Sequence, residues 1–426
     1  PAAVSRPSRL DRPCRPIVSA MPAPSSRAFS QSVVPRLACG LALVLALCMP
    51  HLQAADPVVA PLAQPAPEAI APPAATPEPA PPLYVPDPLE ADEFAGLPPS
   101  VVPETFPDWP RWFAGATGLV MTRTLPTGVP VMRPAGGTQL TTTSGGLSWP
   151  GGVDLHVGRW FGPRQKNAVE LIYWGAFGMG STDAVAGSGI VAIPQAAATI
   201  GGTPAVDYLT NATGQEISRS DLVNDIEINW LYSLGDRPEF PSRDPSSPSR
   251  PVNLMWIAGF RFFQLEDVLT ASTTSATAGS PLDFAVASNN NLYGGQFGLK
   301  FDWRFANRLR FNAVPKFMVA GNSITNTSTL GTAGGTPAVF TASGAPVNVH
   351  SPLGVFSWLG SIDTGVAWDV TDRWTLSIGY RVVGVNNIAE ADGQWPTLIT
   401  NESLSAIAAG SSTIIHGGFA GFEARY

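Results

Sequence analysis

Residues 293–319 alternate for most of their length between large apolar side chains and polar or small ones, with one interruption at 306–307. Successive residues of a β-strand point to opposite faces, so a period of two predicts two strands joined by a tight turn. One face is unusually aromatic and the other carries full charges. The apolar positions are Tyr293, Phe297, Leu299, Phe301, Trp303, Phe305, Leu309, Phe311, Phe317 and Val319; the charged ones are Lys300, Asp302, Arg304, Arg310 and Lys316.

The same alternation recurs along the chain and predicts about ten strands. They cover 109–124, 147–161, 168–180, 219–234, 252–267, 292–305, 308–322, 355–368, 373–388 and 411–426. Their connections alternate in length. Short turns fall at 162–167, 306–307 and 369–372, with a longer Pro-rich one at 235–251, and long connections at 125–146, 181–218, 268–291, 323–354 and 389–410. This rhythm is typical of an up-and-down barrel threaded through a membrane.

The identity of the two faces favours a membrane barrel over a secreted β-sandwich. Only 13% of residues are charged, while 44% are hydrophobic, and the charges gather on the face opposite the aromatics. We therefore predict an all-β fold, an up-and-down antiparallel transmembrane β-barrel over residues 109–426. The expected lumen-facing residues are Asp154, His156, Lys300, Asp302, Arg310, Lys316, Asp363, Arg381, Glu423 and Arg425. The expected aromatic girdle at the membrane boundary is Trp303, Phe305, Trp368, Trp374 and Tyr426.

The segment before the barrel is predicted to be an export signal followed by a linker. An apolar run at 37–49 lies between Arg36 and a small-residue site near Ala54, which is too short for a membrane span. Residues 1–54 are thus expected to be a cleaved signal peptide, with translation starting at Met21; a lipoprotein signal at Cys48 is the alternative. Residues 55–108 are Pro- and Ala-rich and are expected to be a disordered periplasmic linker.

An even strand number places both chain ends on one side of the membrane, expected to be the periplasm of a Gram-negative-type bacterium. The last residue, Tyr426, is aromatic, a common ending that the barrel-assembly machinery reads. The expected partners are this machinery, outer-membrane lipid and lipopolysaccharide. The formal charge of −7 and the absence of a basic patch argue against nucleic acid. The sequence predicts no oligomeric state.

Four stretches resemble one family. They are GFRFFQLEDVLT (259–270), NNLYGGQFGLKFDW (290–303) with the strand that follows it to 322, FSWLGSIDTGVAWDVTDRWTLSIGYRVVGVNNIA (356–389) and HGGFAGFEARY (416–426). These motifs are similar to those of the planctomycete beta-barrel porin-7 family, over roughly residues 110–426. The resemblance implies an outer-membrane barrel without a defined substrate. One departure is EADGQWP (390–396), which lacks the Arg that the family pattern has there.

The sequence contains few candidates for catalysis or metal binding. His156 lies two residues from Asp154 and shares its face. The pair could act as a proton relay in an outer-membrane hydrolase, or form a salt bridge in the lumen. No nucleophile or second acid accompanies it, so we favour the salt bridge and no enzymatic activity. His350 and His416 have no metal-ligand spacing. We expect neither a cofactor nor a metal.

The long connections are acidic, which bears on transport. They carry Asp183, Asp207, Glu216, Asp283, Glu390, Asp392 and Glu402 against Arg133. An acidic outer mouth would concentrate cations, so a pore would be a small-solute, cation-preferring porin. Alternatively, these acids bind divalent cations that bridge lipopolysaccharide. Since ten strands make a narrow barrel, a non-conducting structural or surface-adhesion barrel presenting long extracellular loops is the competing hypothesis.

Overall fold

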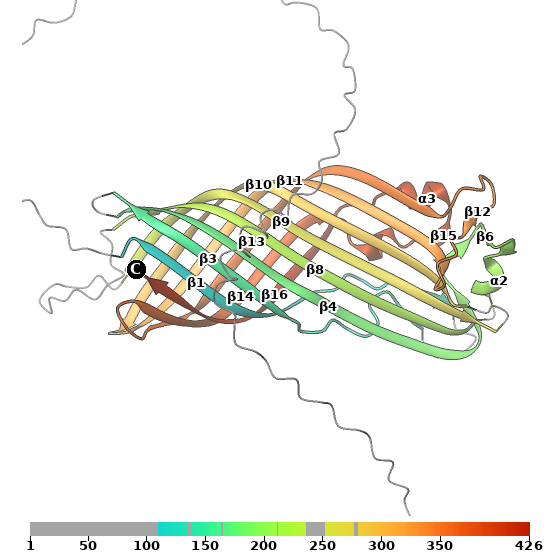
Figure 1. The fold of residues 1–426 in the computed structure, drawn as a ribbon, viewed down its shortest axis with the longest axis horizontal. Helices are drawn as coiled ribbons and strands as arrows, with labels where there is room; N and C mark the ends of the chain where they lie inside the picture. The colour runs from blue at the N-terminus through green and yellow to red at the C-terminus, as the bar shows by residue number, and fades with distance from the viewer. Residues whose placement is uncertain (1–109, 134–138, 163–164, 211, 236–251, 277–279) are drawn as a thin grey trace, which may run out of the picture. The chain divides into compact units, whose positions relative to one another are not determined.

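The computed structural model describes residues 110–133, 139–162, 165–210, 212–235, 252–276 and 280–426 (Figure 1). The predicted signal peptide at 1–54 and the predicted linker at 55–108 lie outside these residues. Every described element lies in one compact unit, residues 97–426.

Ten long antiparallel strands follow one another around a closed barrel. They are β1 (Trp112–Arg123), β3 (Gly151–Phe161), β4 (Asn167–Ala192), β8 (Ala212–Ser233), β9 (Val252–Ser275), β10 (Leu282–Ala306), β11 (Leu309–Thr332), β13 (Asn348–Asp369), β14 (Trp374–Ile388) and β16 (Ser411–Arg425). Each pairs with its neighbours in sequence, and β1 pairs with β16, which closes the barrel. The predicted fold class, strand number and up-and-down order are confirmed.

The strands form two walls of different height. Six consecutive strands, β4, β8, β9, β10, β11 and β13, have 22 to 26 residues each. The other four, β14, β16, β1 and β3, have 11 to 15. A tilted strand needs only about 9–11 residues to cross a membrane, so the tall wall extends well beyond one.

The tall wall contradicts the prediction of long loops at 181–218, 268–291 and 323–354. Much of each stretch is strand in the structure, for example 282–291 of β10 and 323–332 of β11. The alternation continues through these residues, but its polarity inverts. In β10 every second residue from 282 to 292 is buried and points inward; beyond the polar Asn290 and Ser288 these residues are Val286, Phe284 and Leu282. The outer face has no large aromatic residues in this part of the strand. The sequence pattern that identified strands is therefore missing.

This inversion divides the barrel into two zones. The membrane zone has an apolar outer face that covers 226–232, 252–262, 293–305, 309–319, 356–368 and 374–382, and its large side chains are exposed. The head is the part of the tall wall beyond it: 212–221, 263–275, 282–292, 320–332 and 348–355. Its outer face is small and polar, as at Ala287, Asn289 and Thr327. The zone boundary follows the lengths expected of spanning strands.

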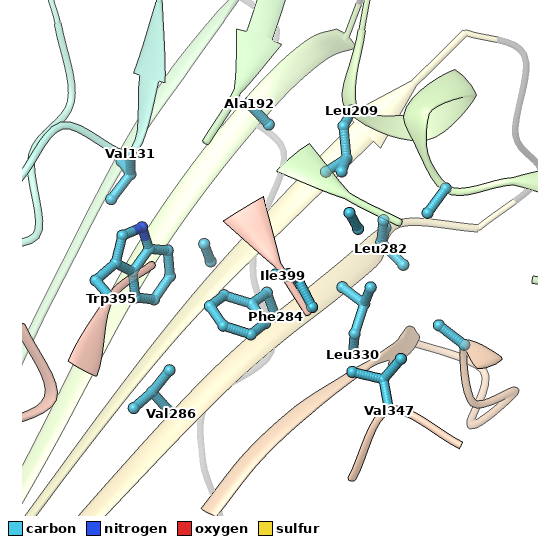
Figure 2. Packing of buried hydrophobic residues seen from close by; sticks show 14 of the residues in the cluster. Val131, Ala192, Leu209, Leu282, Phe284, Val286, Leu330, Val347, Trp395 and Ile399 are labelled. Carbon is cyan, nitrogen blue, oxygen red and sulfur yellow. The ribbon is translucent and has the colours of Figure 1, made fainter. Parts of the chain in front are cut away.

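Short elements fold into the head and fill it. They are β2 (Met132–Arg133), β5 (Gln195–Ala196), β6 (Ala198–Ile200), β7 (Thr203–Pro204), α2 (Val206–Leu209), β12 (Val339–Phe340), η2 (Ala391–Gln394), β15 (Leu398–Ile399) and α3 (Asn401–Ser405). They gather at the end opposite the short turns (Figure 1). Their apolar side chains pack against the inner face of the tall wall, with Trp395 edge-on to Phe284 at 4.8 Å between ring centroids (Figure 2).

The head therefore has an ordinary hydrophobic core. The interior of the membrane zone combines charged residues with smaller apolar clusters, one around Met318 and Leu359 and one around Leu231 and Ile257. Among the described residues, no helix is both long and apolar enough to cross a membrane.

Candidate functional site

The interior of the membrane zone contains ion pairs between strands far apart in sequence. Arg381 of β14 donates to Asp363 of β13 at 2.8 Å and to Asp154 of β3 at 2.7 Å. Its guanidinium also lies over the Trp174 ring, 5.1 Å from the centroid. Three of the predicted lumen residues thus meet at one point, because odd positions of β13 and β14 and even positions of β3 share the inner face.

His156 lies between two acidic side chains. Its Nε2 lies 3.5 Å from Glu423 and its Nδ1 4.0 Å from Asp154. Glu423 in turn accepts a hydrogen bond from Arg425 at 2.8 Å. These contacts make His156 one member of a charged network, which agrees with the salt-bridge interpretation of the His156–Asp154 pair.

The centre of the membrane zone holds charged residues that sequence reasoning missed. Lys316, one of the predicted set, donates to Glu227 at 2.8 Å, and Gln296 donates to the same carboxylate at 2.8 Å. Arg261 donates to Asp225 at 2.6 Å. The missed residues follow a recognisable rule, since every second residue from 219 to 229 points inward. That stretch reads Arg219, Asp221, Val223, Asp225, Glu227 and Asn229.

The remaining predicted lumen residues lie nearer the short turns. Arg310 approaches Asp369 at 3.9 Å, and Arg304 approaches it at 3.5 Å. Asp302 is buried on the inner face of β10, and among the described residues its Oδ2 receives no hydrogen bond. Lys300 interacts electrostatically with Glu170 and Glu423.

A second charged layer, which we call the upper layer, lies in the head. It consists of Arg123, Arg219, Asp221, Asp267, Glu390 and Asp392. Arg123 donates to Asp221 and to Glu390, at 2.6 Å each, and lies 3.0 Å from Asp267. Arg219 lies 3.4 Å from Asp267 and donates to Asp392. Four carboxylates thus surround two guanidinium groups.

The upper layer corrects one prediction. Glu390 and Asp392 were expected at an acidic outer mouth, but they are buried, with Glu390 only 1% exposed. The connection after β14 turns inward instead of outward, because Arg123 and Arg219 project into the head and pair with these two acids. The family departure EADGQWP coincides with this buried segment.

Burial shifts the pKa values of this layer. Desolvation raises the pKa of Asp221 to about 7, although Arg123 lowers it and the neighbouring Asp267 raises it further. Desolvation also raises the pKa of Glu390. Desolvation would raise the pKa of Asp267 as well, but Arg123 and Arg219 outweigh it and the net pKa is lowered. Burial therefore favours the neutral form of Asp221 and Glu390 and opposes that of Asp267.

The five predicted girdle residues are all exposed, between 47% for Trp303 and 61% for Tyr426. They lie at the short-turn end, since Leu309 pairs with Trp368 and Tyr426 exchanges backbone hydrogen bonds with Trp112. Trp112 was missed, because the first strand alternates poorly in sequence.

Among the described residues, no group of three His, Cys, Asp or Glu side chains is arranged to hold a metal ion. His350 instead bonds Thr327 at 3.0 Å, and His416 bonds the Tyr380 hydroxyl at 2.6 Å.

A closed antiparallel barrel with an apolar belt and a charged interior is an outer-membrane β-barrel. Residues 130–413 match the model of the family described as "Putative beta barrel porin-7". The chain belongs to that family. The match confirms the resemblance noted from the sequence, while the planctomycete origin stays a prediction. No curated protein matches the chain by sequence.

Several solved outer-membrane proteins match the chain at low identity and low TM-score. The outer-membrane protease OmpT of Escherichia coli is 11% identical, over 74% of this chain and 94% of OmpT, with a TM-score of 0.37. The toluene transporter TodX of Pseudomonas putida is 9% identical, over 75% and 91%, with a TM-score of 0.28. The translocator domain of the autotransporter NalP from Neisseria meningitidis is 7% identical, over 75% and 88%, with a TM-score of 0.31.

Proposed function

We propose that this protein is a structural outer-membrane barrel, closed to ions at neutral pH, which holds a folded head outside the membrane. The observation that carries the proposal is the upper layer. The side chains of Arg123, Asp221 and Asp267 are 0% exposed, so protein atoms enclose them on every side. An aqueous pore needs a continuous wet path, and this layer interrupts it.

The apolar residues packed inside the head support the same proposal. Loop-derived elements pack an apolar cluster across the head above the upper layer. Ions cannot cross such a region, because apolar side chains offer no replacement for their hydration. The proposal includes no catalytic step. The hydrolase alternative would need a nucleophile beside His156, whose polar contacts here are carboxylates.

Conductance of the refolded protein in planar bilayers at pH 6.5 tests this proposal. We expect no conductance steps for the intact chain. Stable ohmic steps at that pH would overturn it. Gel mobility before and after heating provides the folding control, so that silence from an unfolded sample is not mistaken for a closed barrel.

A second candidate is the small-solute, cation-preferring pore, and one observation favours it. The upper layer has four carboxylates against two guanidinium groups, so an opened lumen would attract cations and repel anions. Reversal potentials across a salt gradient would measure the preference, and anion selectivity would sink this idea.

The orientation and partners of the barrel are part of the proposal. Both ends of the barrel domain lie at the short-turn end, where Phe113 pairs with Arg425. We assign that end to the periplasm, with the export signal and Pro-rich linker preceding it. The girdle residues and the final strand are then the contacts for outer-membrane lipid and for the assembly machinery. The exposed acids of the head, such as Glu216, face lipopolysaccharide.

A further inference from the structure

The connection after β14 forms a plug inside the head. We define the plug segment as residues 389–395, which include η2. Its backbone is clamped at its first residue, because Asn290 of β10 donates to the Ala389 carbonyl at 2.8 Å and accepts from the Ala389 amide at 2.9 Å. At its last residue Trp395 packs on Phe284 and donates to the Ile193 carbonyl at 3.3 Å (Figure 2).

Between these two anchors, ionic contacts hold the plug segment to three strands. Glu390 pairs with Arg123 of β1, and Asp392 pairs with Arg219 of β8. Asp267 of β9 accepts from the Ala391 amide at 2.9 Å. Asp221 of β8 completes the set, and β10 contributes only neutral side chains, Ser288 and Asn290, at this level.

The charges of this layer do not balance. Four carboxylates face two guanidinium groups, and all six side chains are at most 3% exposed. An uncompensated charge away from water is strongly unfavourable. Asp221 and Asp267 aggravate the imbalance, since they stand directly opposite each other on the inner faces of β8 and β9. Like charges in that position repel.

The geometry shows where compensation can enter. Each of the four carboxylates has one oxygen that is buried and, within the described residues, accepts no hydrogen bond: Oδ1 of Asp221, Asp267 and Asp392, and Oε2 of Glu390. A proton on one of these oxygens removes a charge and supplies the missing donor. Asp221 and Asp267 come close enough to share such a proton.

We propose that bound protons hold the plug segment in the head, and that alkaline medium releases it. The docked state needs protons on the excess carboxyls, whereas a released and hydrated segment does not. The docked state thus binds more protons, and a rise in pH favours release. The inference goes beyond the proposed function, because a barrel closed at neutral pH needs no pH-sensitive plug.

The direction of two pKa shifts agrees with this mechanism. Burial raises the pKa of Asp221 to about 7 and raises the pKa of Glu390. With both carboxyls protonated, two remaining carboxylates balance two guanidinium groups.

Thiol labelling of the full chain tests the proposal. Ala389 is fully buried, so Ala389→Cys introduces a small probe in the plug segment, with Cys14, Cys39 and Cys48 replaced by Ser. The reagent is a membrane-impermeant maleimide, and its rate is corrected for thiolate fraction with a Thr327→Cys reference on the outer face of the head. We expect corrected labelling to be slow at pH 6 and to rise by up to about tenfold per pH unit for each proton released. A corrected rate that stays flat to pH 9 overturns the proposal.

Variants at other positions distinguish protonation from other causes of release of the plug segment. Asp221→Asn is a neutral mimic of the protonated acid and supplies one of the two neutral carboxyls, so release should begin at a higher pH than in the parent and depend less steeply on pH. Arg123→Gln removes a guanidinium and should give fast labelling at pH 6. Glu402→Gln, an exposed acid on α3 in the same connection, should leave the pH profile unchanged. If Asp221→Asn is released like the parent, the proposal fails.

A bound metal ion could compensate the same charge, and labelling in the presence of EDTA tests for such an ion. Fast labelling at pH 6 on addition of EDTA alone would identify a divalent cation as the neutralising partner and overturn the role of protons. Conductance of the parent at pH 6.5 tests the proposed function separately, so failure of one leaves the other standing.

Discussion

Strand β10 crosses two environments, and its side chains exchange roles between them. In the membrane zone Phe297 points outward and is 57% exposed, while Gln296 and Asp302 point inward. In the head Phe284 points inward and is 3% exposed, while Ala287 and Asn289 point outward. The backbone ladder to β9 continues through both zones without a register shift. The apolar face therefore changes sides along a strand whose backbone pairing is unchanged. The cause is the surroundings, since lipid surrounds one zone and water the other.

The comparison shows that one continuous sheet can carry its large apolar side chains on the outer face in one half and on the inner face in the other. In the head the hydrophobic effect drives apolar side chains into the interior. In the membrane zone lipid covers the apolar outer face, so the interior can hold ion pairs beside smaller apolar clusters. Substitutions should therefore have opposite consequences in the two zones.

The largest expected effect comes from the core of the head. Phe284→Ala should lower the free energy of unfolding by about 3–5 kcal/mol, because it leaves a cavity beside Trp395. Denaturant titration of the barrel refolded in lipid vesicles measures it. Phe297→Ala is the matched control; lipid fills the space it leaves, so its cost should be far smaller. Equal losses at both positions would break the comparison.

A charge on the outer face should come next. Phe297→Arg places a guanidinium in the hydrocarbon and should destabilise the barrel by about 2–4 kcal/mol in vesicles. Ala287→Arg, on the same face of the same strand but in the head, should change stability by less than about 0.5 kcal/mol. If Ala287→Arg were as costly, the head would also be embedded in lipid.

The upper layer predicts a pH dependence of stability. A carboxyl whose pKa is raised on folding contributes stability at low pH that is lost as pH rises through its folded value. For Asp221, with a pKa of about 7, the free energy of unfolding should fall by on the order of 1 kcal/mol between pH 6 and pH 8. Denaturant midpoints measured across that range check it. Asp221→Asn should flatten the slope, and an unchanged slope would remove Asp221 as its cause.

The smallest effect is expected on the outer face of the head. Thr327→Ala removes an exposed hydrogen bond to His350 and should change the free energy of unfolding by less than about 0.5 kcal/mol. The same titration serves as the measurement. A loss above 1 kcal/mol would mean that this face is covered in the folded protein.

The sequence predicted the membrane zone well, since aromatic and charged residues alternate there with strong contrast. All ten strands were located, most of them from that contrast, including the hairpin from Tyr293 to Val319, although the first strand alternates poorly. The sequence predicted the head poorly. In 282–291 the outward residues are small and the inward ones modestly apolar, so the alternation is weak and the stretch resembles a loop rich in Ala, Ser and Asn.

The upper layer was missed for a different reason. Arg123, Asp267 and Glu390 belong to three segments, and their proximity depends on barrel closure and on a connection that folds inward. No local pattern encodes either event. In β8 every second residue from Arg219 to Asn229 points inward. Applying this period of two to the sequence would have identified Asp221 and Asp225 as interior residues.

Closure of the barrel joins the two ends of the domain, with Phe113 opposite Arg425 and Arg123 opposite Ile415. Each other seam of the wall links strands adjacent in the chain. Only this one requires a contact across the whole domain, and its loop-closure entropy cannot be offset until the last strand has formed. Until then β1 and β14 each present an unpaired edge, which would be costly in lipid and prone to pairing with other chains. The final strand thus acts as the completion signal of assembly, and the chain is most vulnerable to aggregation just before that strand is in place.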